Sequence, residues 1–175
     1  TQNALNSLNS AYTEWKRLSG RDITFGIDGQ PVANARYEVQ DPGVATEQNM
    51  RTVTRQVMYL MGRTPQVQEI LAQLSDDQIK QTTITYAGQN VSTWDVFDSW
   101  DRPIFFVPPG RPWAGGDTEP RDTDGTLRHS FEQVLGIAPN QSGYFLSAGP
   151  DQTFGNAFAS ADTQARTQSE DNIYS

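Results

Sequence analysis

Carboxylates are the chemically capable side chains that this sequence supplies in quantity, and they gather in three stretches of the chain. Paired carboxyl groups can serve as the acid and base of a glycosidase, and carboxylate oxygens can bind a hard cation such as Ca²⁺. Most of them lie in Gly- and Pro-rich stretches, where an acidic chain places solvated charges, so we favour a non-catalytic role. The three groups are Asp95, Asp98 and Asp101; Asp117, Glu119, Asp122 and Asp124; and Asp151, Asp162, Glu170 and Asp171.

The last of these stretches has the composition that Ca²⁺ coordination requires. Residues 148–151 (Ala-Gly-Pro-Asp) form a predicted tight turn that exposes carbonyl oxygens beside the Asp151 carboxylate. Glu170 and Asp171 follow near the end of the chain, and Arg166 is the one cation in this region. Ca²⁺ takes such hard oxygen ligands from irregular loops. An ordinary solvated acidic loop is the alternative that the spacing leaves open.

Other site chemistries lack their residues. His129 is the only histidine and there is no cysteine, which excludes multi-histidine and thiolate zinc sites. There is no G-x-S-x-G elbow for a serine nucleophile and no glycine-rich phosphate-binding motif. Asp122 and Asp124 resemble the start of an EF-hand loop, but the twelfth position, which requires Glu, holds Gln133. We therefore predict neither a zinc site, a nucleotide site nor an EF-hand.

The overall composition limits the partners. The chain has 175 residues, with 13 Lys and Arg against 21 Asp and Glu, for a formal charge of −8. Such an acidic protein repels phosphate backbones, which disfavours nucleic acid as a partner. No stretch approaches the roughly 20 apolar residues of a membrane span, and no signal peptide is visible. The length fits a single domain with a modest core.

The elements that must position these residues begin with a helix over about residues 2–18. Gly20 follows where a helix C-terminus is expected, with basic residues in the last turn. Because the pattern is already helical at the first residues, we expect an upstream segment to precede it. The apolar positions at helical spacing are Ala4, Leu5, Leu8, Ala11, Tyr12, Trp15 and Leu18.

Further helices are predicted before most of the strands. Residues 22–45 read as a loop with one strand near 35–39, and helices follow from Thr46 to Met61 and through 67–74. A turn at 75–78 is expected to bury Ile79. The remaining expected elements are a hairpin over 82–94, strands at 103–107 and 143–147, and a short helix containing Phe131, Val134 and Leu135. This order predicts an α+β fold with antiparallel strands.

The two ends of the last region carry a family resemblance. Residues 144–151 (Tyr-Phe-Leu-Ser-Ala-Gly-Pro-Asp) and 170–175 (Glu-Asp-Asn-Ile-Tyr-Ser) resemble the C-terminal signature of type II secretion major pseudopilins and related type IV pilin-like proteins. In that family, a strand ending in S-x-G-x-D leads through a loop to an acidic close. Residues 98–107 are similar to the family's D-x-W-G-x-P strand entry, with Asp101 in place of the Gly. The opening helix resembles the soluble half of the long pilin helix.

The resemblance implies a pilin-like domain over residues 1–175, in which an amphipathic helix packs on a small antiparallel sheet. The helix would cover residues 1–20, a helical and loop insertion residues 21–81, and the sheet with a long C-terminal loop residues 82–175. The segment 21–94 is longer than a major pseudopilin needs, and so is the loop between Asp151 and Asp171.

The resemblance also implies a function without catalysis. Family members are filament subunits for protein export, made as prepilins whose N-terminus is cleaved and methylated. A hydrophobic helix half, which this chain lacks, anchors them in the inner membrane and leaves the globular domain in the periplasm. The implied partners are other copies of the chain and other pseudopilins.

In the major pseudopilins the C-terminal loop binds calcium. Carried over by position, Asp151 and Asp171 match the acidic ligands, while Ala148 and Ser169 would contribute backbone carbonyls. Asp162 and Glu170 are further candidates within this chain's longer loop. The composition agrees, because a loop so rich in Ser, Thr, Gln and Ala has too few apolar groups to order itself.

A second hypothesis belongs to a different class of protein. A secreted carbohydrate-active hydrolase could use two of the loop carboxylates, and a carbohydrate-binding module could do without them. In either case Trp94, Trp100 or Trp113 would provide the platforms for sugar rings.

Overall fold

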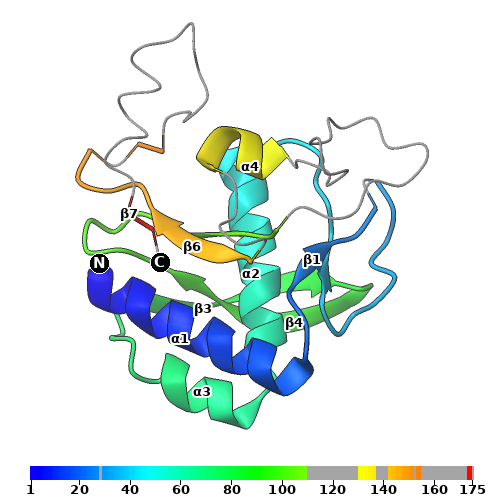
Figure 1. Ribbon diagram of the computed structural model, residues 1–175, viewed down its shortest axis with the longest axis horizontal. Helices are drawn as coiled ribbons and strands as arrows, with labels where there is room; N and C mark the ends of the chain where they lie inside the picture. Colours follow the sequence, from blue (N-terminus) through cyan, green and yellow to red (C-terminus); the bar gives the residue numbers. More distant parts are fainter. Residues whose placement is uncertain (28, 110–129, 137–141, 152, 155–172, 175) are drawn as a thin grey trace, which may run out of the picture.

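The computed structural model describes residues 1–27, 29–109, 130–136, 142–151, 153–154 and 173–174. The helices within these residues are α1 (Gln2–Ser19), α2 (Glu47–Gly62), α3 (Pro65–Leu71) and α4 (Ser130–Leu135). Its strands are β1 (Thr24–Phe25), β2 (Glu38–Val39), β3 (Ile79–Tyr86), β4 (Gln89–Val96), β5 (Phe105–Val107), β6 (Tyr144–Ser147) and β7 (Ile173–Tyr174). The protein therefore has an α+β fold, as predicted (Figure 1).

Helix α1 confirms the first predicted element. Its apolar stripe from Ala4 to Trp15 is buried, whereas Leu18 at its end is 43% exposed. Gly20 ends the helix with φ 74°, a left-handed conformation that costs glycine little, and its N–H donates to the Lys16 carbonyl at 2.8 Å. The helix packs against α3 and against β6.

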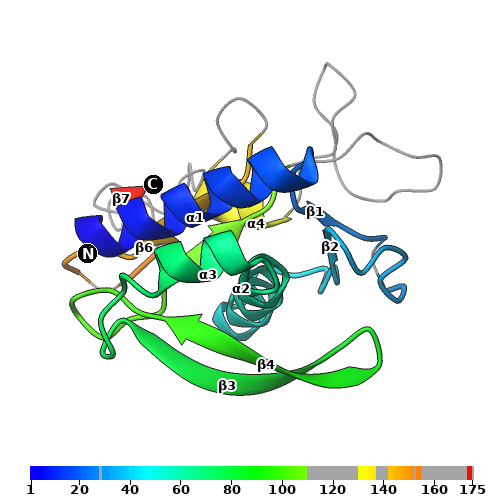
Figure 2. The ribbon, with the colours of Figure 1, turned by 90° about the horizontal axis from the view of Figure 1, so that it is seen from below.

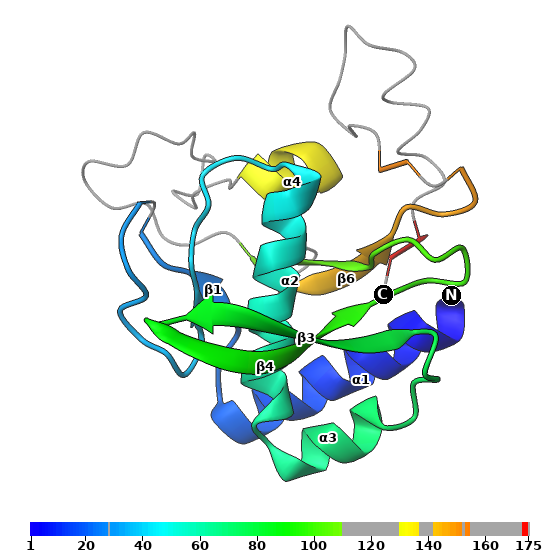
Figure 3. The ribbon, with the colours of Figure 1, turned by 180° about the vertical axis from the view of Figure 1, so that it is seen from behind.

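Helix α2 occupies the centre of the molecule, a place that the sequence analysis did not assign to any helix. It begins after Thr46, whose hydroxyl accepts a hydrogen bond from the Asn49 N–H at 3.1 Å. One side of α2 contacts β4 and the other contacts β5. Figure 2 shows α2 between the β3–β4 hairpin and the layer that holds α1 and β6, and Figure 3 shows the hairpin crossing it. Two layers of strands therefore share one central helix.

In the part of the chain that the structure describes, the strands form three small sheets, whereas we expected one. Strands β3 and β4 make the predicted antiparallel hairpin, longer than expected, with Ala87 and Gly88 at its turn. Strands β5, β6 and β7 form an antiparallel sheet in that order. The parallel pair β1–β2 was not predicted, because two-residue strands carry no periodicity. The turn at 75–78 forms, but Ile79 begins β3 and is only half-buried.

The core between α1, α2 and the β5–β6–β7 sheet is rich in aromatic side chains. The Phe106 ring lies 4.8 Å from that of Tyr12 and 4.9 Å from that of Phe145, both edge to face. Gly143 lies so close to Phe106 that an added Cβ would clash with the ring. The packing of these rings holds β5 and β6 in place. It thereby positions the turn before β5 and the turn after β6.

Candidate functional site

A tight turn before β5 is built around the buried carboxylate of Asp98, which is 4% exposed. Phe97 and Pro103 pair across the turn, and the Asp98 N–H donates to the Arg102 carbonyl at 2.9 Å. One carboxylate oxygen, Oδ1, accepts the N–H groups of Trp100 at 2.9 Å and of Arg102 at 3.0 Å. The side chain thus replaces backbone partners that so short a turn cannot supply.

The other carboxylate oxygen of Asp98 joins this turn to the one that follows β6. The Ser147 hydroxyl donates to Asp98 Oδ2 at 2.6 Å, across 49 positions of sequence. The same hydroxyl accepts the Gly149 N–H at 3.1 Å. Both Asp98 and Ser147 are buried, where a satisfied carboxylate is stabilised by such short, charge-assisted hydrogen bonds. The two motifs of the resemblance therefore meet at one hydrogen-bonded junction.

Strand β7 pairs with β6 beside the junction of Asp98 and Ser147. In β7, Ile173 pairs with Ser147 and Tyr174 pairs with Leu146. The chain leaves β6 through residues 148–151 and rejoins β6 at Ile173. Strand pairing therefore places Ile173 beside Ser147 at the end of β6.

Asp101 has a backbone conformation that glycine usually provides. Its φ is 58°, in the left-handed region, where Asp and Asn are tolerated better than most other residues. Its carboxylate is 78% exposed and lies 3.1 Å from Lys80 Nζ. The motif that residues 98–103 resemble carries Gly at this position, and Gly adopts a positive φ readily.

The turn after β6 presents Asp151 to solvent. Gly149 has φ 74°, Ala148 is fully buried, and Asp151 Oδ1 accepts the Thr153 N–H at 2.8 Å. Phe154 then stacks on Phe105, with ring centroids 4.6 Å apart. The sequence analysis missed Phe154 as an anchor of the loop. An aromatic residue in an otherwise polar stretch was the available signal.

The predicted calcium ligands are described only in part. Ala148 and Asp151 lie in the turn after β6, whereas Asp162, Ser169, Glu170 and Asp171 lie outside the described residues, as does His129. Within the described part of the chain, no group of three or more acidic or histidine side chains is placed to hold a metal ion. Ca²⁺ binding therefore stays a prediction.

The first group of carboxylates does not form a single site. Asp95 faces two arginines of α2, Asp98 faces Ser147, and Asp101 faces solvent. Burial alone raises the pKa of Asp95, but hydrogen bonds from Arg55 and Arg51 outweigh it, so the pKa lies below its usual value. The second group, residues 117–124, lies outside the described residues. Each described carboxylate of the first group thus has a different environment.

The tryptophans do not form a shared platform in the described residues. Trp94 is half-buried and packs so closely on α2 that a Cβ on Gly62 would clash with its ring. Trp100, in the Asp98 turn, is 36% exposed, and Trp113 lies outside the described residues. Trp94 therefore serves to dock the hairpin on α2.

Comparisons of the chain with protein-family models, with curated proteins and with solved structures found no match. The resemblance to pseudopilins consequently rests on the residues of the two turns and of the C-terminal close. Among the helices of the described residues, none combines the length and apolarity needed to cross a membrane.

Proposed function

We propose that this chain is the pilin-like globular domain of a non-enzymatic structural subunit, belonging to a type II secretion pseudopilus or a related type IV pilus-like filament. The observation that carries the proposal is the hydrogen bond from the Ser147 hydroxyl to Asp98 Oδ2 at 2.6 Å. Asp98 opens the D-x-W-x-x-P turn and Ser147 opens the S-x-G-x-D turn. The two motifs were recognised separately in the sequence, so their contact supports a common structural purpose.

The conformation of Asp101 supports the same proposal. The sequence departs from the family pattern at this position, where Asp replaces Gly. Its positive φ of 58° is a conformation that Gly, the residue of the family motif, adopts readily. The departure is therefore compatible with the family's turn.

The proposal includes a structural Ca²⁺ in the C-terminal loop. Asp151 and Asp171 would supply carboxylate oxygens, and Ala148 and Ser169 backbone carbonyls, with Asp162 and Glu170 as further candidates. The exposed carboxylate of Asp151 and the return of the chain from the loop to Ser147 support this assignment. A hard cation would order a loop of this polar composition for contact between subunits.

The proposed partners are other copies of this chain and other pseudopilins. By analogy with the family, α1 would continue upstream into an apolar helix half that packs in the filament core and anchors the precursor in the inner membrane. The domain described here would then lie in the periplasm.

The full-length precursor provides the test. It should be expressed in cells with an active or an inactivated prepilin peptidase, and the sheared surface fraction and the periplasm assayed for the protein. We expect peptidase-dependent shortening and recovery in sheared filaments that require the peptidase. Removal of a secretory signal by another peptidase, followed by release of free protein, would reject the proposal in favour of a secreted enzyme or binding module.

A further inference from the structure

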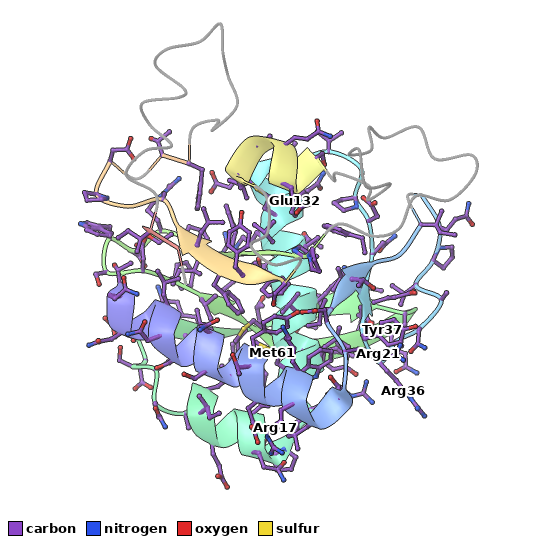
Figure 4. All side chains as sticks on the ribbon, viewed as in Figure 1. Arg17, Arg21, Arg36, Tyr37, Met61 and Glu132 are labelled. Atoms are coloured by element: carbon purple, nitrogen blue, oxygen red, sulfur yellow. The ribbon has the colours of Figure 1, made fainter. Side chains whose placement is uncertain are left out.

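A cavity of about 360 Å³ lies where α1 ends and β2 begins. Figure 4 shows Arg21, Arg36 and Tyr37 at this end of the molecule, beyond the last turn of α1. Two guanidinium groups, a phenol, an amide and a hydroxyl are the side chains that recognise a carboxylate. The lining residues are Ser19, Arg21, Asn34, Arg36 and Tyr37.

The backbone beside this cavity is held by local hydrogen bonds. Asn34 Oδ1 accepts the Arg36 N–H at 3.1 Å, and the Ser19 hydroxyl donates to the Arg21 carbonyl at 3.1 Å. The Arg21 guanidinium lies 4.0 Å from the centre of the Tyr37 ring. Stacking of this kind limits the orientations of the guanidinium plane. Arg21 is therefore oriented before any ligand arrives.

The other cations at this end already have partners. Arg17 donates two hydrogen bonds to Glu14, at 2.8 and 2.6 Å, and Lys16 Nζ lies 3.2 Å from Asp22 Oδ1. Arg63 donates to the Ala35 carbonyl at 3.2 Å. By contrast, neither Arg21 nor Arg36 forms an ion pair with any carboxylate of the described residues. Among the described residues, two exposed guanidinium groups thus lack an ion-pair partner, in a protein whose net charge is −8.

The opposite end of α1 carries exposed carboxylates. The Ser99 N–H donates to Thr1 Oγ1 at 3.0 Å, which places the Asp98 turn against the start of α1. Asp101 in this turn is 78% exposed and lies 3.1 Å from Lys80 Nζ, itself half-exposed, and Asp151 in the neighbouring turn is also exposed. The 18 residues of α1 separate the two ends by about 27 Å. Exposed carboxylates therefore lie at the end of α1 opposite Arg21 and Arg36, and we refer to this end as the acidic end.

We propose that the basic end, defined by Arg21, Arg36 and Tyr37, binds carboxylates at the acidic end of a second copy of this chain. The inference rests on the proposed function, because a filament requires one subunit to bind the next. A contact between two different surfaces leaves one free surface of each kind, so it repeats and can generate a helical array. Such opposite charges also speed the encounter of copies that otherwise repel one another.

The test compares two double variants that change the net charge equally. Arg21→Gln/Arg36→Gln removes the available guanidinium groups, whereas Arg17→Gln/Arg63→Gln removes two that already have partners at the same end. Sedimentation of the domain at concentrations up to about 1 mM in about 20 mM salt should reveal self-association that weakens at about 300 mM salt. We expect about tenfold weaker association for the first variant and a change of less than about twofold for the control.

Arginine side-chain Nε–H signals provide a second readout that does not depend on a variant. On raising the protein concentration, those of Arg21 and Arg36 should shift more than that of Arg17. Asp101→Asn, at the acidic end, should weaken association by about threefold.

Several results would overturn the inference. They are a wild-type domain that stays monomeric, equal losses in both double variants, and unchanged association in Arg21→Gln/Arg36→Gln. Inorganic phosphate or phosphatidylglycerol vesicles that shift the Arg21 signal without any self-association would instead identify a small-anion or membrane site. Full-length chains separate this inference from the proposed function. If filaments form equally well with Arg21→Gln/Arg36→Gln, only the proposed contact is rejected. If the wild type forms no filaments, the proposed function is rejected, and the sedimentation result decides whether the contact exists.

Discussion

Asp95 and Asp98 are two buried carboxylates separated by three positions, and the protein stabilises them in different ways. Asp95, in β4, is met by two arginines of α2: Arg51 at 3.1 and 2.9 Å and Arg55 at 2.7 and 2.7 Å. Asp98 instead accepts two backbone N–H groups and the Ser147 hydroxyl. The first arrangement docks a hairpin on a helix through charge, and the second fixes two turns through geometry.

The difference determines how each site responds to change. Bidentate hydrogen bonds between arginine and a carboxylate tolerate small displacements of either side chain, and they depend on ionisation of the carboxylate. The three neutral donors to Asp98 lose their acceptor when the carboxylate is removed, and buried donors without acceptors are costly. We therefore expect the Asp98 junction to be sensitive to deletion of the side chain and the Asp95 site to be sensitive to acid.

Removal of the Asp98 carboxylate should have the largest effect. Asp98→Ala removes the acceptor of the Ser147 hydroxyl and of the N–H groups of Trp100 and Arg102. We therefore expect the free energy of unfolding to fall by about 3–4 kcal/mol. Ser147→Ala removes a single partner and should cost about 1–2 kcal/mol. Urea denaturation at neutral pH measures both. Losses below about 1 kcal/mol for Asp98→Ala would contradict the junction's structural role.

Neutralisation of Asp95 should have the second-largest effect on the free energy of unfolding. Asp95→Asn leaves Arg51 and Arg55 without their counter-charge and should lower the free energy of unfolding by about 2–3 kcal/mol at neutral pH. Because the folded-state pKa of Asp95 is lowered, its contribution is present above the unfolded pKa of about 4 and is lost as pH falls through the folded value. The stability of the wild type should thus decline more steeply than that of the variant between about pH 5 and pH 2. If the stabilities of the wild type and of Asp95→Asn depend on pH in the same way, Asp95 does not cause the loss of stability in acid.

Asp151 extends the comparison of Asp95 with Asp98 to a carboxylate whose proposed partner is a metal ion. Calcium at about thirty times its dissociation constant should stabilise the wild type by about 2 kcal/mol. Asp151→Ala should abolish this increase, because its carboxylate is a proposed ligand of the ion. Melting temperatures in CaCl₂, EGTA and MgCl₂ provide the measurement. A calcium shift that survives in the variant would exclude Asp151 from the site.

Asp101 offers the smallest and most specific change in the Asp98 turn. Asp101→Gly relieves the left-handed conformation and should raise the free energy of unfolding by about 0.5 kcal/mol, while Asp101→Val should lower it by about 1 kcal/mol. The exposed contact with Lys80 contributes little in either case. Lys80→Ala, as the control for that contact, should leave thermal stability nearly unchanged. Equal stabilities of the Gly and Val variants would contradict the observed backbone conformation.

Local patterns explain why the sequence predicted part of the fold. Helices α1, α2 and α3 and the β3–β4 hairpin each carry their own periodicity, caps or turn residues, and each was found near its predicted place. The parallel β1–β2 pair carries no such pattern. Its two short strands form because the chain around them is brought together in three dimensions.

The junction illustrates the same limit for the candidate site. Asp98 and Ser147 were both part of recognisable motifs, but nothing in either motif states that one side chain donates to the other. Likewise, Arg51 and Arg55 recur at helical spacing without indicating that Asp95 lies opposite them. Hydrogen bonds and ion pairs between distant residues depend on how the elements pack, which local periodicity does not encode.

The sequence by itself determined the α+β class, the main helices, the hairpin and the two turn motifs, since these follow from spacing, propensity and backbone requirements within a few residues. Only the tertiary structure decided that α2 lies at the centre, that Ser147 closes the Asp98 turn, and that Arg21 and Arg36 lie together without ion-pair partners among the described residues. The physical reason is that burial and charge pairing are properties of the packed chain, and a single segment determines neither.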